Sequence, residues 1–65
     1  MLLRIEFPPG QDGASSFEKH QISRVPCVRE YLCIGEAMYE VYLVTHALNA
    51  NPACDVVADV RVVRA

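Results

Sequence analysis

Three cysteines and two histidines are the most reactive side chains of this sequence. Cys27, Cys33 or Cys54 together with His46 and Asp55 would supply the nucleophile, the base and the orienting carboxylate of covalent catalysis. None of the cysteines stands at a strand-to-helix turn or beside a glycine-rich loop that could form an oxyanion hole. A chain of 65 residues also has little room to enclose a substrate. We therefore predict that the protein is not an enzyme.

The cysteine spacing also bears on metals and disulfides. An odd number of cysteines excludes a complete set of intramolecular disulfides, so reduced thiols are expected. A zinc site would need a fourth ligand such as His46 or His20, and the cysteines lack the closely spaced pairs of usual zinc sites. Free cysteine generally packs as a small apolar residue. We predict no metal, no cofactor and core positions for the thiols.

Arginines and tyrosines form the most promising binding set. A guanidinium group recognises phosphate or carboxylate through paired donors, and a tyrosine ring offers a large contact area at small entropic cost. These side chains would converge if the second, third and last predicted strands were neighbours. The alternative is a solvated face whose charges are balanced by Glu30, Glu40 and Asp59. The candidate ligand- or partner-binding residues are Arg24, Arg29, Tyr31, Tyr42, His46, Arg61 and Arg64.

The elements that position these residues follow from alternating apolar side chains, the period of a half-buried strand. Leu3, Ile5 and Phe7 alternate with charged residues until Pro8 and Pro9, after which a turn-rich loop is expected from residue 10 to 16. Further strands are predicted over residues 20–25, 28–34, 38–46 and 56–63, with a hairpin centred on Gly35. The expected fold is one mostly β domain over residues 1–65, a small five-stranded SH3-like barrel or a strongly curled antiparallel sheet.

One segment fits two periods. Residues 36–49 also place apolar side chains at helical spacing, so an α+β fold with a helix there is the alternative. The many β-branched and aromatic residues in the segment favour a strand.

The last predicted strand carries valines on both faces. An exposed strand of this kind is a template for pairing with another chain. We therefore expect it either at the centre of the sheet or at a subunit interface, with Val57 and Val63 as the candidate self-interface residues.

The segment from Val25 to Ile34, followed by Gly35 and by Met38 to His46, resembles a pattern in short, uncharacterised bacterial and phage proteins with SH3-like barrels. That pattern has a glycine just before its third strand, where this chain has Arg29 and Glu30. The resemblance covers about a third of the chain. It implies a compact barrel used for binding, and it transfers no catalytic residue.

Composition narrows the function classes. With 52% hydrophobic and 22% charged residues the chain is too apolar for a disordered protein, and its net charge of −2 disfavours nucleic-acid binding. No apolar run is long enough to span a membrane and no signal peptide is recognisable, so a cytoplasmic location is expected. We predict a non-catalytic module that binds another protein, itself as a homo-oligomer, or both, such as a phage or mobile-element inhibitor of a host protein. The alternative is a binder of nucleotides, other small ligands or nucleic acid through the arginines and tyrosines.

Overall fold

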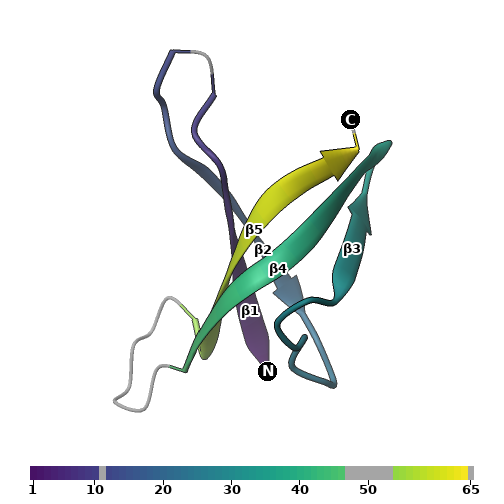
Figure 1. Cartoon of the computed structure of the whole chain (residues 1–65). Coiled ribbons are helices and arrows are strands. Elements are labelled where there is room, and N and C mark those ends of the chain that lie inside the picture. Colours follow the sequence, from purple (N-terminus) through teal and green to yellow (C-terminus); the bar gives the residue numbers. More distant parts are fainter. Residues whose placement is uncertain (11, 47–53, 65) are drawn as a thin grey trace.

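The structure, a computed structural model, describes residues 1–10, 12–46 and 54–64 (Figure 1). Within these ranges the chain is mostly β and has no helix, which confirms the predicted fold class. The five strands are β1 (Leu2–Phe7), β2 (Ser16–Gln21), β3 (Tyr31–Ile34), β4 (Ala37–His46) and β5 (Val56–Arg64).

The strands form one strongly curled sheet in the order β2-β1-β5-β4-β3. Two antiparallel hairpins, β1–β2 and β3–β4, lie on either side of β5, which pairs antiparallel with β4 and parallel with β1. The sheet is therefore mixed. Among the described residues the backbones of only neighbouring strands come close together, so the edge strands β2 and β3 do not pair and the sheet closes only half a barrel.

The core lies on the concave side of this half-barrel, which we call the inner face. Strand registers place Ile5 opposite Ala58, and Val41 opposite Val60, and opposed residues share a face. The buried core residues are Leu3, Ile5, Val41, Val56, Ala58 and Val60. The central position of β5 explains why its sequence carries valines throughout, and it confirms the first of the two places expected for that strand.

Two expectations about strand limits are confirmed and two are wrong. Residues 37–46 form a strand, which excludes the helix over that range, while 47–49 lie outside the described residues. The hairpin turns at Gly35, whose φ of 62° suits a residue without Cβ.

The predicted strand at 20–25 is instead Ser16–Gln21, because the β1–β2 hairpin pairs Phe7 with Ser16. The third strand begins at Tyr31 and not at residue 28, because Arg29 has a left-handed backbone.

Asp55 fixes the start of the parallel pair. Its backbone N–H donates to the Leu2 carbonyl at 2.8 Å, and its carboxylate accepts the Leu2 N–H at 2.8 Å. We expect Asp55→Ala to lower the free energy of unfolding by about 1 kcal/mol, since a backbone donor loses its acceptor. Urea denaturation followed by circular dichroism measures this. Asp55→Asn keeps an acceptor and serves as the control; an equal loss in both variants would contradict the assignment.

Candidate functional site

A row of side chains crosses three strands on the convex side of the sheet, which we call the outer face. Tyr31 on β3 lies opposite Glu40 on β4, and Glu40 lies opposite Arg61 on β5. Residues opposite one another project from the same side of a sheet. They line a groove of about 500 Å³, which we call the Arg–Tyr groove. Its lining residues are Val28, Arg29, Tyr31, Glu40, Val41, Tyr42 and Arg61.

A β-bulge brings Tyr42 into this groove. Val41 lies opposite Val60 and Leu43 lies opposite Asp59, so Tyr42 is the extra residue on β4. The Arg61 guanidinium carbon lies 4.8 Å from the centre of the Tyr42 ring, and Arg61 Nε lies 3.5 Å from Glu40 Oε1. Arg61 is thus held between an aromatic face and a carboxylate.

Arg29 reaches the groove from an unusual backbone conformation. Its φ of 79° lies in the left-handed region, which costs an ordinary residue about 1 kcal/mol. Two hydrogen bonds to one residue of β4 hold it there: the Arg29 N–H donates to the Val41 carbonyl at 2.7 Å, and the Val41 N–H donates to the Glu30 carbonyl at 2.9 Å. Strain that the surroundings hold in place often marks functional positions.

Arg24 lies in the same loop but is engaged elsewhere. Its two terminal nitrogens donate to the two carboxylate oxygens of Glu30 at 3.0 and 2.7 Å, and the Cys27 N–H also donates to this carboxylate. The hydrogen bond from Arg24, followed by that from Cys27, lowers the pKa of Glu30 from 4.5 to about 2. The Arg24–Glu30 pair therefore stabilises the loop that contains Arg29.

The Arg24–Glu30 pair predicts that the stability of this loop depends on pH. The pKa of Glu30 is lower in the folded protein than its ordinary value, so the ionised carboxylate stabilises the fold above pH 4.5. This stabilisation is lost as the pH falls toward about 2. We expect Arg24→Ala to return the Glu30 pKa toward 4.5, as followed by NMR titration of the Glu30 carboxyl carbon. Arg64→Ala, which removes an arginine that lies outside this pair, is the control. An unchanged Glu30 titration in Arg24→Ala would refute the assigned cause.

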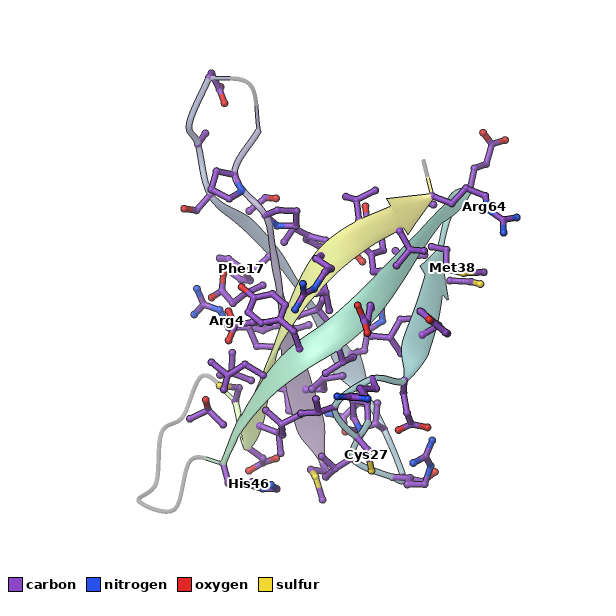
Figure 2. The ribbon with its side chains drawn as sticks, in the orientation of Figure 1. Arg4, Phe17, Cys27, Met38, His46 and Arg64 are labelled. Carbon is purple, nitrogen blue, oxygen red and sulfur yellow. The ribbon has the colours of Figure 1, made fainter. Side chains whose placement is uncertain are left out.

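The structure thus brings four of the seven candidate binding residues together and separates the other three. Arg29, Tyr31, Tyr42 and Arg61 line the Arg–Tyr groove, while Arg24 is paired with Glu30. His46 and Arg64 stand at opposite ends of the β4–β5 pair (Figure 2). Val57, half-buried, and Val63, exposed, project from the outer face of the central strand.

Sequence reasoning missed a second outer-face cluster. The Arg4 guanidinium carbon lies 3.9 Å from the centre of the Phe17 ring, and Arg4 Nε lies 2.6 Å from Glu6 Oε1 (Figure 2). Phe17, which directly follows the predicted loop, lies on β2 directly opposite Glu6. A phenylalanine within an otherwise polar segment was the available signal.

The three thiols differ in their exposure. Cys54 is buried, as expected of a core thiol, but Cys27 and Cys33 are exposed, so the prediction of core positions is wrong for these two. In the ranges that the structure covers, no three histidine, cysteine, aspartate or glutamate residues are grouped as metal ligands.

The same ranges contain no helix long and apolar enough to cross a membrane.

The Arg–Tyr groove is accordingly the site that geometry singles out, with two arginines and two tyrosines on one open face. Comparison of the chain with protein-family models, with curated proteins and with solved structures gave no match.

Proposed function

We propose that this protein is a non-catalytic binding module whose contact surface is the outer face of the sheet, centred on the Arg–Tyr groove. The observation that carries the proposal is the gathering of Arg29, Tyr31, Tyr42 and Arg61 around one groove. Tyrosine and arginine are the residues most enriched among those that dominate binding energy in protein interfaces. No helix or second sheet of the described chain covers this face.

The exposure of the tyrosines supports a protein partner. Tyr31 is 60% exposed and Tyr42 is 44% exposed, although tyrosine in a small sheet commonly packs against a neighbour. Each would bury much of its ring when a partner covers the groove. Leu43 and Val63, both about half exposed on the same face, extend the apolar area. The same surface supports self-association, which we include in the proposal as a homo-oligomer.

Charge indicates which partner group the groove receives. Glu40 is its one carboxylate, and its 3.5 Å distance from Arg61 is long for a charged hydrogen bond. A partner carboxylate can therefore bind Arg29 and Arg61 without displacing a strong ion pair. An acidic surface of another protein is the complementary partner, as an inhibitor of a host protein made by a phage or mobile element would require.

The resemblance to short phage and bacterial barrels stays a prediction, and the chain departs from its pattern at Arg29. The pattern has glycine just before its third strand, and Arg29, at this place, has the positive φ that glycine adopts without strain.

Charge reversal tests the proposal with a matched pair of variants. Arg61→Glu changes the charge inside the groove, and Arg64→Glu makes the same change three residues later on the same strand, outside it. We expect Arg61→Glu and Tyr42→Ala to lose at least about tenfold in affinity for a protein captured by the wild type, and Arg64→Glu to retain it. Equal losses in Arg61→Glu and Arg64→Glu would contradict the role of the groove. Size-exclusion chromatography with light scattering identifies a second copy as the captured partner.

The second candidate function is binding of a nucleotide or other small anionic ligand, or of nucleic acid. The groove volume of about 500 Å³ and the stacked Arg61–Tyr42 pair favour it, because a planar base can stack beside a ring while Arg29 receives a phosphate. Affinity that falls steeply with added salt distinguishes phosphate binding from a protein contact dominated by tyrosines.

A further inference from the structure

The central strand β5 is paired on both sides along only half of its length. β4 follows it to Arg64, whereas β1 pairs only with its first four residues, ending at Glu6 opposite Asp59. After Phe7 the chain continues into Pro8 and Pro9, which have no N–H to donate. In the part of the chain that the structure describes, the register between β1 and β5 ends at the pair Glu6 and Asp59. Residues 60–64 thus have an open edge inside the sheet.

A groove of about 690 Å³ lies at this opening, between the two diverging hairpins. Figure 1 shows the β1–β2 hairpin and the group of β5, β4 and β3 spreading apart toward the C-terminal end of β5. One wall carries Phe7, Pro8 and Glu18, and the other carries Ile34, Tyr39 and Val62. The Phe7 and Tyr39 rings meet there with centres 5.1 Å apart. Val62 remains 50% exposed although its strand is the centre of the sheet.

We propose that this opening receives an extended strand of a partner protein, which pairs with residues 60–64 of β5 and places apolar side chains in the groove. The proposal rests on the binding function proposed above and names the form of the partner. Main-chain hydrogen bonds to an open edge supply affinity in such strand addition, and pockets for alternate side chains supply specificity.

The alternation of β5 defines the partner sequence. Side chains of the added strand that lie beside Val62 face the apolar groove, and those beside Arg61 lie on the outer face next to the Arg–Tyr groove. Arg61 has 60% of its side chain exposed. The partner strand that fits this edge therefore alternates apolar and acidic residues. Its acidic side chains contact Arg61, which lines the Arg–Tyr groove.

A second copy of this chain is a poorer occupant of the same edge. Antiparallel pairing of two β5 strands about Val62 would place Arg61 of one copy diagonally across from Arg61 of the other on the outer face, where the like charges repel each other. The other open edges are also less suited. β2 carries the charged residues Glu18 and Lys19, which discourage strand pairing, and β3 is only 4 residues long.

Peptide binding followed by amide hydrogen exchange tests the proposal on the full chain. The probe is a labelled seven-residue peptide, acetylated and amidated, that alternates valine and glutamate between terminal serines. The controls are a peptide of the same composition with the valines and glutamates in separate blocks, and an alternating valine–lysine peptide. We expect saturable binding of the valine–glutamate peptide alone, with amide exchange slowed at least tenfold at those of residues 60–64 whose N–H points away from β4. Binding of the block peptide with equal affinity, or protection on β2 or β3 in place of β5, overturns the proposal.

Protein variants separate this proposal from the function on which it rests. Val62→Lys puts a charge into the apolar groove, and Val62→Thr removes apolar character while keeping the shape; both are expected to weaken peptide binding at least tenfold. Thr45→Lys, also on an exposed strand position, is the control and should bind normally. If the peptide does not bind at millimolar concentration while Arg61→Glu still abolishes capture of a protein partner, strand addition is wrong and the binding function stands. If Arg61→Glu leaves partner capture unchanged, the binding function itself fails.

Discussion

Replacing Ile5 with alanine is expected to leave the protein close to its unfolding threshold. Ile5 is 4% exposed and lies between Ala58 on β5 and Glu18 on β2, so β1 loses its main contact with the core. Truncation of a buried isoleucine to alanine costs about 3 kcal/mol, from lost burial and from the remaining cavity. A domain of this length has a total stability on the order of 3–10 kcal/mol. Urea denaturation and thermal melting should show a loss of roughly 4–8 °C per kcal/mol.

Ile34→Ala provides the comparison for Ile5→Ala, since it removes the same atoms from a half-buried position on the edge strand β3. Its loss of unfolding free energy should be less than half that of Ile5→Ala. Equal losses would show that the edge strand contributes as much burial as the central strands, contrary to the described core.

Replacing Ala58 with leucine is expected to lower the free energy of unfolding almost as much as Ile5→Ala does. The cause here is excess volume in the core and not a cavity. Ala58 is 0% exposed and lies between Ile5 on β1 and Val44 on β4. Overpacking of this kind costs about 1–3 kcal/mol because neighbours must leave their preferred rotamers or the strands must move apart. Urea denaturation measures the loss, and NMR shifts of Ile5 and Val44 report the displacement.

Ala37→Leu tests the same enlargement at a half-buried position beside the β3–β4 turn. We expect little change in stability there. If Ala58→Leu proved as mild as Ala37→Leu, the interior at Ala58 would have unused space and the small residue would not be needed for the curl of the sheet.

Strand alternation was enough to predict β1 and β5, because each has one face on the core. For β4, whose spacing also fitted a helix, the β-branched and aromatic residues decided. Alternation failed at β2 for a physical reason. The β2 residues that share the inner side with Leu3 and Ile5 are His20 and Glu18, which stay exposed because the half-barrel is open at this edge. A strand that buries nothing shows no apolar period, so its position could not be predicted from apolar spacing.

The site was predictable in part. Arginine and tyrosine chemistry selected Arg29, Tyr31, Tyr42 and Arg61 as candidate binding residues, and all four line one groove. Their convergence depends on the bulge at Tyr42 and on the left-handed backbone of Arg29, and neither follows from alternation. The parallel pairing of β1 with β5 is a contact between distant parts of the chain, which local patterns do not encode.

The place of β5 between the two hairpins also sets an order of events during synthesis. Both hairpins are local in sequence and can form early, but the strand that joins them is the last of the five to leave the ribosome. Until β5 emerges, the nascent chain leaves Leu3 and Val41 without their partners Val56 and Val60. The nascent chain therefore exposes aggregation-prone surface until β5 has emerged, and chaperones that hold such surfaces should engage it over that interval.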